Sequence, residues 1–142
     1  MADLGTGKVA FDLVTPTALI LSERVDMVVI PGSEGDIGVL PGHTPLITTL
    51  RPGLVDVHND GAIVQSLFVF GGFAEATPER CTVLAESVEH LDKISAQDAQ
   101  ARLAQAKETL AAAAEAEKAI SEEAVRAAEA LVLALGMRKG AA

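Results

Sequence analysis

The stretch LVDVHNDGAIVQSLFVF, residues 54–70, carries the plainest structural signal in the chain. Residues 54–57 are rich in strand formers and lead into Asn59-Asp60-Gly61, whose residue types tolerate the positive φ of a tight turn. Residues 63–70 then supply an apolar return strand. The stretch therefore predicts a β-hairpin, and the pair Gly71-Gly72 after it predicts a bulge or a close approach of two backbones.

Short apolar runs separated by turn residues extend this pattern on both sides of the hairpin. Val9, Phe11 and Leu13 alternate with Ala10 and Asp12, which is the period of a strand. Further runs occupy residues 18–21, 25–30, 37–40, 46–50, 73–76 and 81–85. About nine or ten strands at this spacing predict a β-sandwich, or flattened barrel. No helix-length insertion separates the runs, which argues against a parallel α/β sheet.

The composition changes near residue 90, where Ala-rich sequence replaces strands and turns. Of the 48 residues from 95 to 142, 18 are Ala, the strongest helix former. Ser95 is typical of a capped helix start, Ser121 predicts a second start, and Gly136 is expected as a C-cap. We expect an antiparallel two-helix hairpin, with one continuous helix through residues 115–120 as the alternative.

These patterns divide the chain into a β-sandwich domain at residues 1–89 and a helical hairpin at residues 90–142. The Ala-rich hairpin buries little apolar area per residue, so we expect it to be only marginally docked. Two roles remain open for it: a fixed helical cap or a movable arm.

The overall composition excludes several classes of function. The net charge is −9 and aromatic residues are only 3%, which argues against binding to nucleic acid or to anionic lipid. The single cysteine, Cys81, allows neither an internal disulfide nor a cysteine metal cluster, and its apolar surroundings predict a buried side chain. Because no apolar run has membrane-spanning length and no leader is visible, we expect a cytoplasmic protein without a cofactor.

Catalytic patterns are weak. His43, His58 and His90 lack the spacing of metal ligands. Residues 32–38 are Gly-rich but lack the lysine and the following helix of a phosphate-binding loop. Glu34 and Asp36 are better interpreted as surface charge for a partner than as an acid–base pair. The residues alone favour an interaction module over an enzyme, with a small ligand-binding β-sandwich or cupin-like enzyme as the alternative.

Residues 32–46, GSEGDIGVLPGHTPL, are similar to the hallmark stretch of the epsilon subunits of bacterial F-type ATP synthases, G-x-E-G-x-x-G-I-L-P-G-H-x-P. Other landmarks of that family follow in the same order: Val14-Thr-Pro16, Leu50-Arg-Pro-Gly53, Gly71-Gly-Phe-Ala-Glu75 and Val83-Leu-Ala-Glu86. The landmarks span residues 11–89. The helical region resembles the family in type and composition only.

The resemblance implies a ten-stranded β-sandwich, or flattened barrel, followed by an antiparallel two-helix hairpin. It also implies a non-catalytic rotor subunit that binds γ and the membrane ring and couples proton flow to ATP synthesis. It implies a peripheral position on the cytoplasmic face of the bacterial inner membrane. In the family, the acidic turn and the Pro-Gly-His step face the ring, which points here to Glu34, Asp36, His43 and Thr44. The γ subunit is implied to bind an apolar face of the sandwich, near Thr15.

Many relatives also bind ATP through a motif close to I/L-D-x-x-R-A at the first helix, and their helical arm can reach the catalytic head and inhibit hydrolysis. Asp92 and Ala96 match this motif, whereas Ser95 stands at the arginine position. Ser95 has no guanidinium to hold a phosphate. We therefore expect the chain not to bind ATP.

Overall fold

The computed structural model describes residues 7–141 and divides the chain into two compact units, Met1–Glu89 and His90–Ala142. Ten strands come first: β1 (Val9–Thr15), β2 (Ala18–Val25), β3 (Met27–Gly32), β4 (Gly35–Val39), β5 (Leu46–Leu50), β6 (Gly53–Asn59), β7 (Ala62–Val69), β8 (Gly72–Ala76), β9 (Arg80–Ala85) and β10 (Val88–His90). Helices follow them, so the predicted fold class is confirmed.

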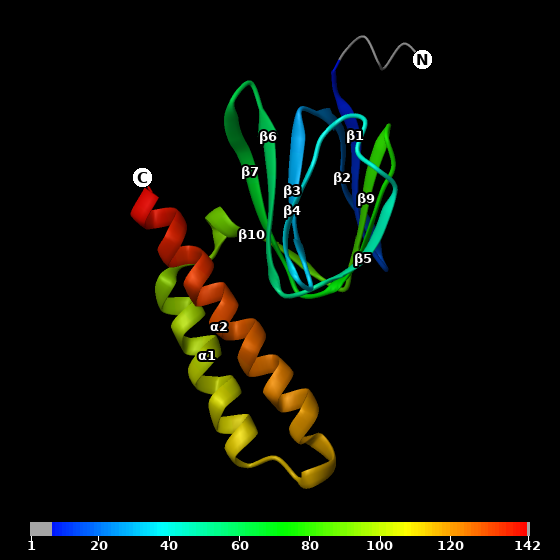
Figure 1. The fold of residues 1–142 in the computed structure, drawn as a ribbon. Helices are drawn as coiled ribbons and strands as arrows, with labels where there is room; N and C mark the ends of the chain where they lie inside the picture. The colour runs from blue at the N-terminus through cyan, green and yellow to red at the C-terminus, as the bar shows by residue number, and fades with distance from the viewer. Residues whose placement is uncertain (1–6, 142) are drawn as a thin grey trace. The chain divides into compact units, whose positions relative to one another are not determined.

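The strands form one curled sheet in the order β10-β7-β6-β3-β5-β8-β9-β1-β2, with β4 paired to β3 (Figure 1). The β1–β9 pair is parallel, whereas β1–β2, β3–β4, β5–β8, β6–β7 and β8–β9 are antiparallel. The curling brings one face of the sheet around a single core. The other face of each strand is left pointing outward.

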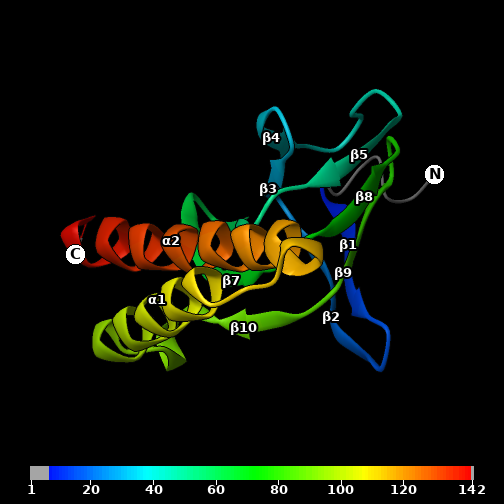
Figure 2. The ribbon, with the colours of Figure 1, turned by 90° about the horizontal axis from the view of Figure 1, so that it is seen from below.

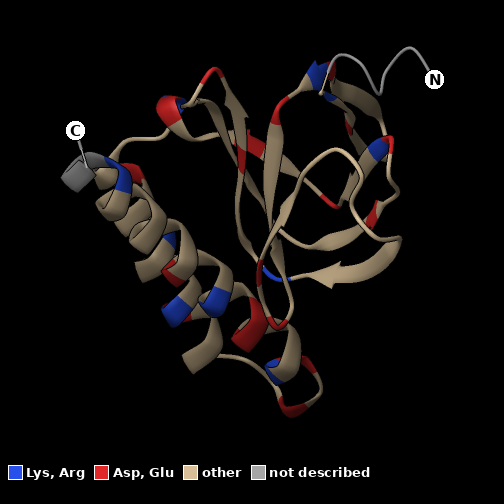
Figure 3. Ribbon diagram, turned by 45° about the horizontal axis from the view of Figure 1, so that its top comes forward, with Lys and Arg blue, Asp and Glu red and all other residues tan. Residues whose placement is uncertain are grey.

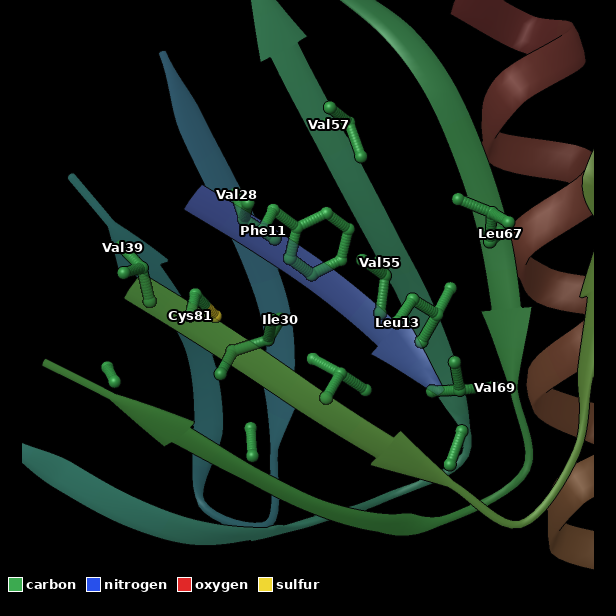
Figure 4. Packing of buried hydrophobic residues seen from close by; sticks show 14 of the residues in the cluster. Phe11, Leu13, Val28, Ile30, Val39, Val55, Val57, Leu67, Val69 and Cys81 are labelled. Carbon is green, nitrogen blue, oxygen red and sulfur yellow. The ribbon is translucent and has the colours of Figure 1, made fainter. Parts of the chain in front are cut away.

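Alternate side chains from most of the strands fill that core (Figure 4). Phe11, Leu13 and Ile30 are fully buried there, and Figure 4 shows them on β1 and β3, in the same core as Val55 and Val69. The cluster draws its members from residues 9–85, and Val88 packs against it half-buried. The core of the first unit is therefore built from that unit's own strands.

The predicted hairpin is confirmed. β6 and β7 pair through a turn in which Asp60 has φ 54° and Gly61 has φ 79°. The predicted close approach at Gly71-Gly72 is also present. Gly72 has φ 124°, and a Cβ there would lie 2.0 Å from the carbonyl oxygen of Leu84. Only glycine fits where β8 passes β9 so closely.

A polar cluster joins the start of β1 to the β2–β3 connection and to the end of β6 with the turn that follows it. Lys8 Nζ lies 2.9 Å from Asp26 Oδ1 and donates to Asn59 Oδ1 at 3.1 Å. The Asp60 N–H donates to Asp26 Oδ2 at 2.7 Å, and the Asp26 N–H donates to Asn59 Oδ1 at 3.0 Å. The hydrogen bond from Asp60, followed by that from Lys8, lowers the pKa of Asp26 below 3.8.

The second unit contains η2 (Leu91–Lys93), α1 (Ala96–Ala111), η3 (Glu115–Glu117) and α2 (Lys118–Ala141). The two helices run antiparallel, side by side, in both views (Figures 1 and 2). The predicted start at Ser95 is confirmed, because the Ser95 hydroxyl accepts from the Asp98 N–H at 2.9 Å. A non-helical step at residues 113–114 precedes η3, so the two-helix prediction holds over the continuous helix.

Two boundaries predicted for the second helix are wrong. Ser121 lies inside α2, which begins at Lys118, and Gly136 lies inside the same helix rather than beyond its end. Gly136 costs about 1 kcal/mol relative to Ala within a helix. That cost is small against the strong propensity of the surrounding residues, which carry the helix past it.

Truncation after Glu89 tests whether the first unit is self-sufficient. We expect residues 1–89 to fold and to melt in one cooperative transition, because the core cluster and Val88 are retained. Circular dichroism and size-exclusion chromatography measure this. An aggregated or non-cooperative fragment would show that the helices complete the core.

Asp26→Asn tests the polar cluster through its pH dependence. Because the folded-state pKa of Asp26 lies below the ordinary value of 3.8, the carboxylate contributes its full stability above pH 3.8. It loses this contribution as the pH falls further, through the lower folded-state pKa. We expect the variant to be less stable than the wild type at pH 7, with the gap closing toward pH 3. Urea unfolding at both pH values measures the gap, with Glu79→Gln as a control because no interaction of the Glu79 side chain is found in residues 7–141.

Candidate functional site

The strand directions give the sandwich two opposite ends. The Thr15–Ala18 turn, the Ser33–Glu34 turn and Arg51 lie at one end, because β1, β3 and β5 all finish there. We call this end A. The loop at residues 40–45, the turn at residues 77–80 and the Asp60–Gly61 turn lie at the other, which we call end B. Figure 1 shows the β3–β4 turn and the loop after β4 at these opposite ends.

At end A, one arginine holds the Ser33–Glu34 turn. Arg51 donates through one guanidinium nitrogen to the carbonyl oxygen of Gly32 at 2.6 Å and through another to Asp36 Oδ1 at 2.6 Å. Two backbone hydrogen bonds support it, from the Arg51 N–H to Pro31 O and from the Ser33 N–H to Thr49 O, both at 3.0 Å. The turn is thus fixed on both of its sides.

The Arg51–Asp36 ion pair faces solvent, with 42% of the Arg51 side chain and 62% of the Asp36 side chain exposed. Pairs of this kind contribute about 0–1 kcal/mol to stability. Glu34 is exposed at the tip of the same turn, and no hydrogen bond or ion pair of its side chain is found within residues 7–141. The turn between β3 and β4 therefore presents one paired and one unpaired carboxylate.

His43 and Thr44 lie at end B. Gly42 has φ 85°, and its N–H donates to Pro78 O at 2.7 Å, which anchors the loop on the turn at residues 77–80. β4 separates this loop from the acidic turn, a length of about 16 Å for five residues. The structure therefore does not bring together the four residues that the sequence motif places close to one another.

The outward face of the sheet carries an apolar patch whose residues the sequence alone did not single out. Phe73 pairs with Leu84, Leu84 with Val14, and Val14 with Leu19, so the four form a row across β8, β9, β1 and β2. Ile47 on β5 is diagonal to Phe73. The exposed fractions are 76% for Ile47, 63% for Leu19, 55% for Phe73 and 47% for Leu84. We call these five residues the outer patch.

The alternation of inward-facing and outward-facing residues along β8 could have revealed this patch. In β8, Ala74 and Ala76 are buried, so Phe73 has the same outward phase as Glu75. A large apolar side chain that shares the solvent-facing side of a strand with a charged residue indicates an interaction site, because exposed apolar clusters mark such sites. Thr15 follows Val14 and lies beside the patch, where its hydroxyl donates to Ala18 O at 3.4 Å.

Charge is unevenly divided between the two parts of the chain. Residues 1–89 hold 12 of the 20 acidic residues but only 4 of the 11 basic ones. Figure 3 shows acidic positions spread over the strands and their turns. On the outward face, Asp12 pairs with Arg80 and accepts from the Ser22 hydroxyl at 2.6 Å.

Three motif positions at the first helix, Asp92, Ser95 and Ala96, are exposed, whereas Leu91 is buried. Asp92 lies in η2, Ala96 is the first residue of α1, and Ser95 is the N-cap. The Ser95 hydroxyl is occupied by the Asp98 N–H. Where the nucleotide motif has an arginine, this chain therefore has a helix-capping serine instead of a guanidinium that could hold a phosphate.

Other chemistry is scarce in the described part of the chain. Cys81 is buried, and burial raises the pKa of its thiol to about 12. Within residues 7–141, no three His, Cys, Asp or Glu side chains come together in a way that could hold a metal ion. None of the helices there is long and apolar enough to cross a membrane.

Comparison with known proteins places this fold in a family. Residues 8–91 match the family described as ATP synthase, Delta/Epsilon chain, beta-sandwich domain. The chain belongs to this family.

Its relatives include proteins named ATP synthase epsilon chain. That of Paramagnetospirillum magneticum is 52% identical over 103 residues, which cover 72% of this chain and 77% of the relative. That of Rhodospirillum rubrum is 47% identical over 131 residues, 92% of this chain and 96% of the relative. A chain in the cryo-EM structure of the Euglena gracilis mitochondrial ATP synthase, OSCP/F1/c-ring in rotational state 1, aligns with a TM-score of 0.81 and 26% identity, covering 91% of this chain and 82% of that one.

Proposed function

We propose that the chain is a non-catalytic rotor subunit in the central stalk of a proton-translocating F-type ATP synthase. In this role it links γ to the membrane ring and so couples proton flow to ATP synthesis. Family membership and the likeness to a chain of an F1/c-ring assembly support the role. The observation that carries it is the outer patch, an apolar surface for a stalk partner on the same sandwich that holds the acidic turn of end A.

The outer patch is proposed as the surface that binds γ. Burying exposed apolar side chains is favourable by about 25 cal/mol per Å² of apolar area, and large aromatic residues near the centre of an interface contribute most. Phe73 stands in the row between Thr49 and Leu84 and is the aromatic member of the patch. Thr15 borders the patch, in agreement with the position near γ that the resemblance implies for it.

End A is proposed as the part of the sandwich that faces the ring. It carries Glu34 and Asp36, two of the four residues that the resemblance assigns to that contact. His43 and Thr44 lie at end B, across the length of β4, so we do not assign them to the ring. A peripheral position on the cytoplasmic face of the bacterial inner membrane follows from the same proposal.

The helical hairpin is proposed as a regulatory arm that can reach the catalytic head. The exposed side chains of Ile120, Leu133 and Met137 on α2 give it apolar surface for such a contact. Because Ser95 replaces the motif arginine, we do not couple the arm to bound ATP. The rate of ATP hydrolysis after removal of the arm decides its role: a rise shows that the arm brakes the motor, and an unchanged rate refutes a regulatory role.

Phe73→Glu tests the γ surface. The wild-type chain should co-elute with a γ-containing complex in size-exclusion chromatography at micromolar concentration. We expect Phe73→Glu to weaken that binding by about 2 kcal/mol or more, the cost typical of a central interface residue. Val64→Glu is the matched control, because Val64 is 51% exposed and lies outside the outer patch.

The outcomes separate the two parts of this proposal. Separate elution of the wild-type chain would refute the rotor role. If Phe73→Glu co-elutes with the γ-containing complex as the wild-type chain does, the assignment of the outer patch to γ is refuted. That result would leave the rotor role intact. Thermal melting of both variants confirms that each is folded.

Titration calorimetry tests nucleotide binding by the isolated chain. We expect no heat of binding at low micromolar ATP, because Ser95 serves as a helix cap and offers no guanidinium. Ser95→Arg is the gain-of-function comparison, although it removes a cap worth about 1 kcal/mol. A micromolar dissociation constant for the wild-type chain contradicts the prediction.

A further inference from the structure

The turn between β6 and β7 places side by side two residues whose side chains can react with the main chain. The side-chain carbonyl carbon of an asparagine or aspartate can be attacked by the backbone nitrogen of the next residue. Glycine at that next position favours the reaction, because it has no Cβ to obstruct the approach. Asn59 is the chain's single asparagine, and Asp60 is its only aspartate followed by glycine.

At Asn59, both reacting groups are held in place. Asn59 Oδ1 accepts hydrogen bonds from Lys8 Nζ at 3.1 Å and from the Asp26 N–H at 3.0 Å, and the residue is half-buried. The nitrogen that would attack it is that of Asp60, whose N–H donates to Asp26 Oδ2 at 2.7 Å. The reaction would have to break these hydrogen bonds, so the polar cluster protects Asn59.

At Asp60, neither reacting group is held. The residue is exposed, and no hydrogen bond or ion pair of its carboxylate is found within residues 7–141. The attacking nitrogen is that of Gly61, whose N–H also lacks a hydrogen-bond partner in that range. Apart from the chain neighbours of Gly61, no atom lies within 4 Å of the place where a Cβ would stand. The approach to Asp60 is therefore open.

The backbone of Asp60 is also in a conformation that it can gain by leaving. Its φ is 54°, and among residues 7–141 no other residue except glycine has a positive φ. An L-residue adopts this conformation at an energetic cost. An exposed turn opens more easily than the strands on either side of it, so the main chain can move into a reactive geometry.

We propose that Asp60 is a site of spontaneous isomerisation to isoaspartate. The Gly61 nitrogen adds to Cγ of the protonated Asp60 carboxyl group, so that an N–C bond forms. The Cγ–OH bond breaks, and the hydroxyl leaves with the amide proton as one molecule of water. A second water then opens the resulting succinimide at either carbonyl, which gives aspartate or isoaspartate. This inference does not depend on the proposed function.

Isomerisation has a structural consequence at the polar cluster. In isoaspartate the main chain runs through Cβ and Cγ, so the tight connection between Asn59 and its strand partner Ala62 gains one main-chain carbon. This change disturbs the hydrogen bond from the Asp60 N–H to Asp26, which in turn pairs with Lys8 at the start of β1. We therefore expect the modified chain to be less stable than the fresh chain.

The experiment incubates the full-length chain at pH 7 in water enriched in heavy oxygen, once in its native state and once unfolded in urea. Peptide mass spectrometry and labelling by an isoaspartyl methyltransferase locate the products. In the native state we expect isoaspartate, with one heavy oxygen from the solvent, at Asp60 and not at Asn59. In urea we expect both residues to react, because the polar cluster no longer protects Asn59.

Two comparisons isolate the reacting groups. Asp60→Glu should lose the isoaspartate signal, because its longer side chain closes a larger and less favoured ring. Asp36 is an internal control within the wild-type chain, since it is exposed but is followed by Ile37 and not by glycine. Urea unfolding of fresh and aged samples should show a loss of stability that grows with the isoaspartate content.

Each outcome decides a separate point. If isoaspartate forms at Asp60 in urea but not in the native chain, the turn protects Asp60 and the proposal is wrong. Equally fast isomerisation at Asp36 would overturn the assignment to the Asp60–Gly61 turn. Deamidation of Asn59 at the same rate with and without urea would refute its protection by the polar cluster. Equal stability of fresh and aged chains would refute the structural consequence.

Discussion

The period-two alternation of side chains across one curled sheet is the constraint on which the rest of this structure depends. Each strand must place alternate residues in a single core, as Phe11 and Leu13 do from β1. The residues between them are then forced outward, whatever their chemistry. The outer patch is a consequence of this rule, because Ala74 and Ala76 take the inward positions of β8 and leave Phe73 outside.

Much of the fold could be predicted from the sequence because its signals are local. The turn at Asn59-Asp60-Gly61 and the close approach at Gly72 depend on the positive φ that those residue types adopt, and Ser95 caps the backbone only three residues away. The boundaries at Ser121 and Gly136 were missed because cap signals compete with helix propensity, and an uninterrupted run of strong helix formers prevails.

The candidate site was harder to predict because it depends on register and strand direction. Asp36 and His43 are close in the sequence, yet one strand places them at opposite ends of the sandwich. The pairing of Asp36 with Arg51 joins residues 15 positions apart across two strands, which no local pattern indicates. In the sequence, Phe73 is part of the apolar run 73–76, and only its alternation with the buried Ala74 shows that it faces outward.

The reactivity of the buried Cys81 thiol reports whether the sandwich is closed or open. Cys81 is the chain's single cysteine, it lies in the core, and its thiolate is nearly absent at neutral pH because burial raises its pKa to about 12. A thiol reagent can therefore modify the native chain only when the sandwich opens, and the rate of labelling reports the free energy of that opening. The same shielding leaves any cysteine introduced on the surface as the sole reactive position for a probe.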